Sequence, residues 1–161
     1  MPVSPKLFRN TLAKFCTGVT IVTTKSQDGL HGLTVNSFTS VSLDPPMILI
    51  CIQKNGLSHS TLYECEDFVV NVLSEEQKAL SDRFANPALD SEERFLDLNF
   101  RLSENSVPIL AGNLGHLECR LVDRFEGGDH TIFIGQVENG DFCAGKQPLL
   151  FYDGGYAYLV S

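Results

Sequence analysis

The hydrophobic pattern near the start of the chain predicts one helix followed by a pair of strands. Ser4 and Pro5 form a helix start, and the next apolar side chains recur at helical spacing until Gly18, at Leu7, Phe8, Leu12 and Phe15. Residues 19–24 are mostly β-branched, which predicts a strand. A glycine-containing turn then leads into a second strand over residues 32–36.

The middle of the chain alternates apolar runs with helix starts. Residues 47–52 are apolar without interruption, which predicts a strand buried on both faces, as in the wall of a small barrel. Residues 58–66 predict a short helix and residues 67–73 a strand. The sequence Ser-Glu-Glu-Gln at residues 74–77 is a capping box, and it predicts a helix that continues to about Ala85.

The second half of the chain reads as strands after one irregular stretch. Residues 86–106 mix proline, charged residues and isolated aromatic residues, so we expect an irregular excursion over the surface. A hairpin turn is predicted at residues 127–129, and the strands are expected at residues 117–125, 130–138, 149–152 and 156–160. The strands form hairpins rather than βαβ units. The fold class is therefore mainly β, a barrel with a few peripheral helices, in a single domain over residues 1–161.

Charge and cysteine usage exclude several classes of partner. The net charge is −8, which argues against nucleic acid or an anionic membrane surface as the main partner. The longest apolar run is far too short to span a bilayer. Five cysteines without a CxxC pair suggest neither a disulfide framework nor a zinc site. Cys51 and Cys119 lie in apolar strands and are expected to be buried thiols. These features indicate a reduced, soluble, cytoplasmic protein.

Common catalytic motifs are missing from the sequence. It contains no GxGxxG, phosphate-binding loop, HExxH or nucleophile elbow. The four histidines stand in separate contexts, so no metal site is expected. A cysteine nucleophile that meets a histidine and an acid only in the folded chain stays open.

Three polar clusters are candidates for a binding site. Half of residues 32–43 carry short hydroxyl or amide side chains, namely Thr34, Asn36, Ser37, Thr39, Ser40 and Ser42. This cluster suits a planar ligand with a phosphate tail, or it forms a serine- and threonine-rich turn. Residues 54–61 follow a strand and lead into a helix, so they form either an anion site or a capped helix with a solvated lysine. The third cluster is residues 127–131, where His130 is a catalytic or a turn histidine.

Taken in order, these segments resemble the short-chain flavin reductases. The resemblance is carried by residues 34–42 (TVNSFTSVS), 68–73 (FVVNVL), 83–85 (RFA), 128–135 (GDHTIFIG) and 148–152 (PLLFY). It covers nearly the whole chain in family order. These proteins are the reductase components of two-component flavin-dependent monooxygenases.

The resemblance implies an FMN-binding split β-barrel that forms homodimers, with the flavin near the subunit interface. The positions that match isoalloxazine contacts, or lie in that stretch, are Thr34, Val35, Asn36, Ser37, Phe38, Ser40 and Val41. The positions in the regions of the phosphate end are Lys54, Ser58 and Arg83. His130 matches the histidine close to flavin and nicotinamide and is the candidate catalytic residue. The stretch expected to touch the dinucleotide includes Phe151, Tyr152 and Gly154.

The activity implied is transfer of hydride from NADH or NADPH to FMN or FAD, which then serves a partner monooxygenase or another acceptor. The cofactor pair performs the chemistry, and backbone N–H groups and hydroxyls near Asn36 would hydrogen-bond the flavin edge. No strong general base is required. Two alternatives share the fold: a flavin-binding electron carrier without a nicotinamide site, and a non-enzymatic split barrel that binds haem or another ligand.

Overall fold

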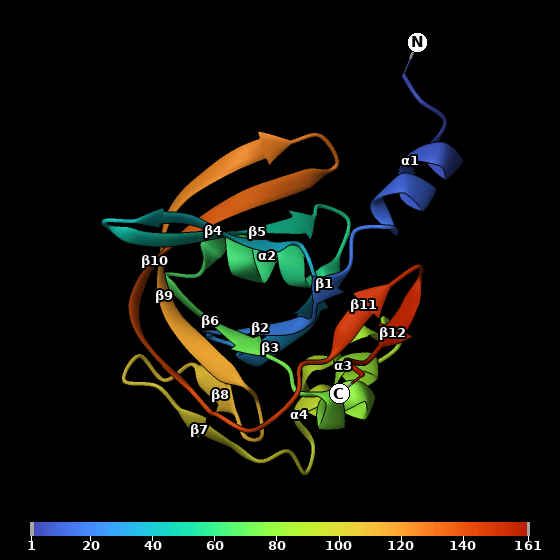
Figure 1. Ribbon diagram of the computed structural model, residues 1–161. Coiled ribbons are helices and arrows are strands. Elements are labelled where there is room, and N and C mark those ends of the chain that lie inside the picture. Colours follow the sequence, from blue (N-terminus) through green and yellow to red (C-terminus); the bar gives the residue numbers. More distant parts are fainter. Residues whose placement is uncertain (1, 161) are drawn as a thin grey trace.

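The protein, described by a computed structural model over residues 2–160, is built around one seven-stranded antiparallel sheet with the order β3-β2-β6-β9-β10-β5-β4 (Figure 1). The strands of this sheet are β2 (Thr20–Ser26), β3 (Gly29–Val35), β4 (Phe38–Leu43), β5 (Pro46–Gln53), β6 (Asp67–Val72), β9 (Gly115–Gly127) and β10 (His130–Phe142). Hairpins connect three of the six neighbouring pairs, β2–β3, β4–β5 and β9–β10. The sheet curls around the main core, so the predicted mainly β barrel is confirmed.

Aromatic side chains fill the main core, and one of them packs so closely that only a glycine fits beside it. Phe68 on β6 and Phe133 on β10 are almost fully buried in the main core. A Cβ atom on Gly135 would lie 2.5 Å from the Phe68 ring. Strands β9 and β10 change register beside Gly135, between Ile134 and Gly135, where a bulge bends the long hairpin over the core.

Strand β5 differs from its prediction because only one of its faces is in the core. Ile48, Ile50 and Ile52 are buried, whereas the alternate residues Leu49 and Cys51 are half-buried. The expectation of burial on both faces, and of Cys51 as a buried thiol, is therefore wrong. Both faces are apolar because the second one lines a cavity, described below. Cys119 is buried as expected, and burial raises the pKa of its thiol to about 12.

Helix α1 (Pro5–Leu12) begins as the sequence predicts, because the Ser4 hydroxyl accepts a hydrogen bond from the Leu7 N–H at 3.2 Å. It ends earlier than expected. Turn hydrogen bonds take over after Leu12, and Gly18 belongs to strand β1 (Thr17–Gly18). No residue of α1 is buried, and Figure 1 shows the helix standing away from the sheet.

The remaining helices lie against the barrel. They are α2 (Leu57–Glu64), α3 (Lys78–Ala85), α4 (Ser91–Phe95) and the 3-10 turn η1 (Glu75–Gln77). The predicted capping box at Ser74 and Gln77 is confirmed. The stretch 86–106 is not wholly irregular, because it contains α4 and strand β7 (Phe100–Leu102), which pairs with β8 (Pro108–Leu110). Phe95 of α4 packs edge-on against Phe84 of α3 at 5.1 Å, and this contact orders the segment.

A second, small sheet joins the two ends of the described chain. Its order is β1-β11-β12, where β11 is Leu150–Tyr152 and β12 is Gly155–Ala157, so the last strand ends earlier than predicted. Thr17 pairs with Phe151 across 134 residues of sequence. The Lys14 ammonium also reaches the Asp153 carboxylate at 2.7 Å. This sheet places residues from both ends beside β3 and β4. Within residues 2–160, no helix has the length and apolar character needed to cross a membrane.

Candidate functional site

Two neighbouring cavities share the polar segment that the sequence singles out. The larger has a volume of about 780 Å³ and the smaller about 360 Å³. Asn36, Ser37 and Cys51 line both. The junction is held by two hydrogen bonds: the Cys51 N–H donates to the Ser37 carbonyl at 3.1 Å, and the Ser37 hydroxyl donates to the Cys51 carbonyl at 2.7 Å. A ligand longer than either cavity can therefore extend past these residues.

The larger cavity is apolar. Its walls include Leu12 at the end of helix α1 and Phe15 just after it, Phe38 and Leu49 from β4 and β5, and Phe151 from β11. Asp153 and Gly154 complete the rim in a turn where both residues have positive φ, 51° and 81°. A planar aromatic ring system suits such a lining, and Asn36 and Ser37 supply polar groups along one edge.

The smaller cavity is more polar than the larger one and carries no carboxylate among its described lining residues, although the whole chain has a net charge of −8. Its wall includes Gly56 at the start of α2, together with Ser58 and His59. Gly56 provides no side chain that could cap the helix. Arg94 and His130 line the same space. Free helix N–H groups with a guanidinium and imidazoles nearby favour an anion.

His130 sits at the mouth of the smaller cavity and is oriented by its neighbour. Its Nδ1 lies 2.7 Å from the Asp129 carboxylate, and this hydrogen bond holds the pKa of Asp129 below its usual value. His59 is fixed in a similar way, with Nε2 2.8 Å from the Thr131 hydroxyl. The Nε2 of His130 therefore remains available to a ligand.

The structure brings together most of the residues expected from the sequence. Those that line the smaller cavity are Thr34, Val35, Asn36, Ser37, Ser58 and His130. Those that line the larger are Asn36, Ser37, Phe38, Phe151 and Gly154. The Thr34 hydroxyl is already used, because it donates to the Ser81 carbonyl at 2.6 Å.

Five expected residues line neither cavity. Lys54 is paired with the Glu126 carboxylate and donates to the Gly128 carbonyl at 2.8 Å. Arg83 donates to the Leu96 carbonyl at 3.1 Å. The other three are Ser40 and Val41 on β4 and Tyr152 on β11, all of them exposed.

Among the lining residues that sequence reasoning missed are Arg94 and Cys51. Arg94 lies in the stretch expected to be irregular, and nothing local marks it as part of a site. Cys51 carried a usable signal, because strand alternation with the isoleucines on either side of it places its thiol on the opposite face. Burial raises the pKa of this thiol, which keeps it protonated and unreactive at neutral pH.

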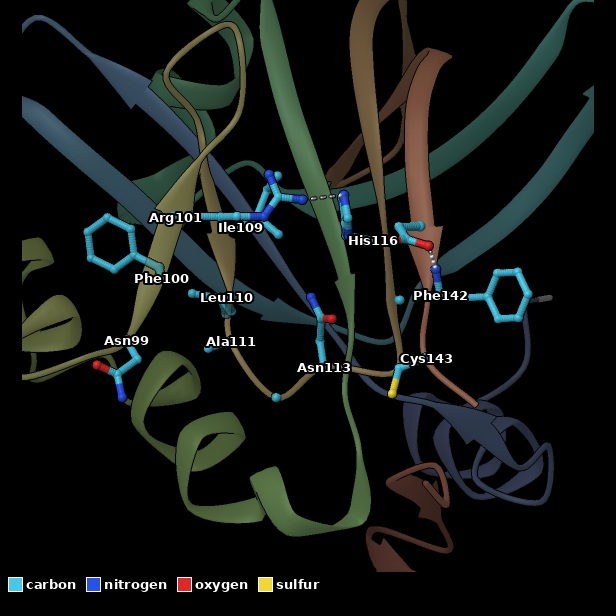
Figure 2. A pocket seen from close by; sticks show the side chains of 13 residues that line it. Asn99, Phe100, Arg101, Ile109, Leu110, Ala111, Asn113, His116, Phe142 and Cys143 are labelled. Carbon is cyan, nitrogen blue, oxygen red and sulfur yellow. Dashed lines mark hydrogen bonds between the residues drawn. The ribbon is translucent and has the colours of Figure 1, made fainter. Parts of the chain in front are cut away.

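A further cavity of about 490 Å³ lies between β7, β8 and the ends of β9 and β10 (Figure 2). Figure 2 shows Arg101 and His116 pointing toward each other, with Nη2 and Nε2 3.5 Å apart. Glu118 lies at the same distance from His116. This cavity shares no described lining residue with the other two and includes none of the residues expected from the sequence.

Comparison with known proteins identifies the family. The sequence profile of the flavin reductase like domain matches residues 12–159. The chain belongs to the flavin reductase family. The resemblance carried by the sequence motifs is thereby confirmed.

Similar proteins cover this flavin reductase almost from end to end. The reductase subunit HsaB of a flavin-dependent monooxygenase from Mycobacterium tuberculosis is 38% identical over 96% of this chain and 82% of its own. FMN reductase (NADH) SmoA from Agrobacterium fabrum is 40% identical over 92% and 83% of the two chains.

A solved structure extends the likeness to the fold of this flavin reductase. The NADH:FAD oxidoreductase SgcE6 of Streptomyces globisporus C-1027, in complex with NAD and FAD fragments, superposes with a TM-score of 0.90 at 37% identity. The alignment covers 99% of this chain and 97% of the other. The split-barrel expectation is confirmed. The residues of the flavin reductase also fit a flavin, since the larger cavity suits its ring and the smaller suits its phosphate.

Proposed function

We propose that this flavin reductase transfers hydride from NADH or NADPH to FMN or FAD and releases reduced flavin to a partner monooxygenase or another acceptor. The observation that carries the proposal is the pair of joined cavities, one apolar and one free of carboxylates among the described residues. Relatives named as NADH-dependent reductases and as monooxygenase subunits support the same donor and acceptor. A cytoplasmic location suits five free cysteines.

The flavin and the dinucleotide supply the hydride chemistry, and this chain supplies binding and orientation. The apolar wall formed by Phe38, Leu49 and Phe151 would hold the ring system and exclude water from it. Polar groups at Asn36 and Ser37 would hydrogen-bond the ring edge, where negative charge develops as hydride arrives. The smaller cavity would hold the phosphate.

The direct test is consumption of NADH or NADPH by the purified protein with and without added FMN or FAD. We expect oxidation of the dinucleotide that depends on added flavin, and comparison of the four pairs gives the preferred donor and acceptor. Protein that keeps its flavin through purification but oxidises neither dinucleotide would support an electron carrier instead.

We further propose that His130 positions the dinucleotide. Replacing it with alanine is expected to raise the KM for NADH or NADPH several-fold and to leave the Kd for flavin nearly unchanged, because Nε2 is free to contact the nicotinamide amide. Asp129→Asn should have the same effect to a smaller degree, since it weakens the bond that orients the ring.

Two other outcomes would overturn the positioning role of His130. A fall in kcat, with a pH dependence lost in the variant, would make His130 a proton donor to reduced flavin. Wild-type kinetic constants together with a lower melting temperature would make it a turn residue that serves only the hairpin.

We also propose that the protein is a homodimer. Helix α1 exposes Leu7, Phe8 and Leu12 by more than half, and Phe15 beside it is 76% exposed. This apolar stripe adjoins the larger cavity and is not covered by any other part of residues 2–160. Light scattering at micromolar concentration should give a mass of twice 17.8 kDa. A mass of one chain would contradict the proposal.

A further inference from the structure

The two basic residues expected at the phosphate end, Lys54 and Arg83, line neither of the joined cavities, whereas Arg94 does. Lys54 is neutralised by Glu126, and Arg83 bonds to the backbone of the loop after α4. Arg94 lines the smaller cavity together with Ser58 and His130. The helix that carries Arg94 is fixed against β3, because its guanidinium donates to the Gly32 carbonyl at 2.8 Å.

Not all N–H donors of the Arg94 guanidinium are hydrogen-bonded. Nη1 bonds to Gly32 and Nη2 to the Asn86 carbonyl at 2.9 Å, both of which are neutral acceptors. Its Nε–H is buried without a partner, one of two such side-chain atoms in the described part of the chain. No carboxylate of residues 2–160 forms an ion pair with it. Arg94 is therefore a partly buried cation that lacks its anion, and burial lowers its pKa accordingly.

The surroundings of Arg94 favour an anion. The start of α2 presents backbone N–H groups without a side-chain cap, and Ser58 adds a hydroxyl. The cavity joins the apolar one at Asn36 and Ser37. An anionic group at Arg94 would thus belong to a ligand whose ring lies in the apolar cavity.

We infer that Arg94 holds the phosphate end of the flavin and determines how strongly the enzyme prefers phosphorylated flavins to riboflavin. This inference rests on the proposed flavin site. Charge-assisted hydrogen bonds to phosphate carry the preference, because riboflavin offers the same ring without the charge. Arg83 acts only on the loop that it contacts.

The test compares Arg94→Gln with Arg83→Gln, a matched control in which the lost guanidinium also bonds to a backbone carbonyl. Dissociation constants for riboflavin and FMN are measured by quenching of flavin fluorescence. In Arg94→Gln the ratio of the riboflavin Kd to the FMN Kd should fall by about ten- to a hundredfold. The same ratio should stay within about twofold of wild type in Arg83→Gln. Arg94→Lys keeps the charge and should lie between.

The outcomes separate this inference from the proposed function. Equal losses for riboflavin and FMN in Arg94→Gln, or a loss of preference in Arg83→Gln instead, would overturn the role of Arg94 while the flavin site stands. If Arg94→Gln does not fold, Arg94→Lys decides, since an unchanged ratio there with full loss in Arg83→Gln would assign the phosphate to Arg83. Wild-type protein that binds neither flavin would overturn the proposed site itself.

Discussion

Asn71→Leu is expected to lower the free energy of unfolding by about 3–5 kcal/mol, a large fraction of the stability of a single domain. Asn71 is fully buried on β6. Its amide donates to the Ile21 carbonyl at 3.0 Å, and its oxygen accepts from the Leu110 N–H at 2.9 Å. A leucine of similar size would leave the Leu110 N–H buried without a partner and would remove the side-chain bond from β6 to β2. Urea denaturation followed by circular dichroism measures the change.

Asn113→Ala provides the control for this substitution. The Asn113 amide also donates to the Asn71 oxygen, at 3.1 Å, but it is only partly buried and can be replaced by water. Its loss should cost less than about 1 kcal/mol. Stability of Asn71→Leu within that range would show that Asn71 does not hold β2, β6 and β8 together.

Cys51→Trp is expected to weaken binding of every flavin at least a hundredfold, which corresponds to about 2.7 kcal/mol. Cys51 stands at the junction of the two cavities, and an indole there would occupy the path between the apolar and the polar space. The fold should persist, because the thiol is half-buried and faces the cavities rather than the core. Fluorescence titration with FMN, FAD and riboflavin measures the loss, and a melting curve checks the fold.

Cys51→Ser distinguishes the effect of side-chain size from the effect of losing the thiol group. It keeps the size of the side chain, so flavin binding should stay within about threefold of wild type. A Cys51→Trp protein that binds FMN as well as wild type does would show that the ring does not lie between these cavities.

The sequence predicted the strands well where local pattern and long-range packing agree. Residues 20–26 and 67–72 are rich in β-branched residues, and the Ser74 capping box is a local signal. Pattern alone failed at β4 and α4. The structure divides the polar run from residue 32 to residue 43 into two strands, because β4 pairs with β5 at the far edge of the sheet. Helix α4 is short and depends on contact with a distant aromatic ring.

The site was predictable to the extent that one continuous segment of the sequence carries it. Asn36 and Ser37 stand out in the sequence, and the structure places them at the cavity junction. No motif in the sequence predicts that Arg94, and not Arg83, lines the smaller cavity. Helix α3 turns Ser81 and Phe84 toward the sheet, which leaves Arg83 on another face. Arg94 reaches the cavity only because the chain after α3 folds back along β3.

Strand β1 near the start of the chain pairs with β11 near its end, so this sheet can form only late in synthesis on the ribosome. Phe151 and Gly154 form part of the apolar cavity, and Tyr156 bonds to Ser81, which in turn accepts from Thr34. A nascent chain that has exposed only β1 to β10 already holds the barrel strands but lacks this wall. We therefore expect the larger cavity to be complete only after residues 150–157 leave the exit tunnel.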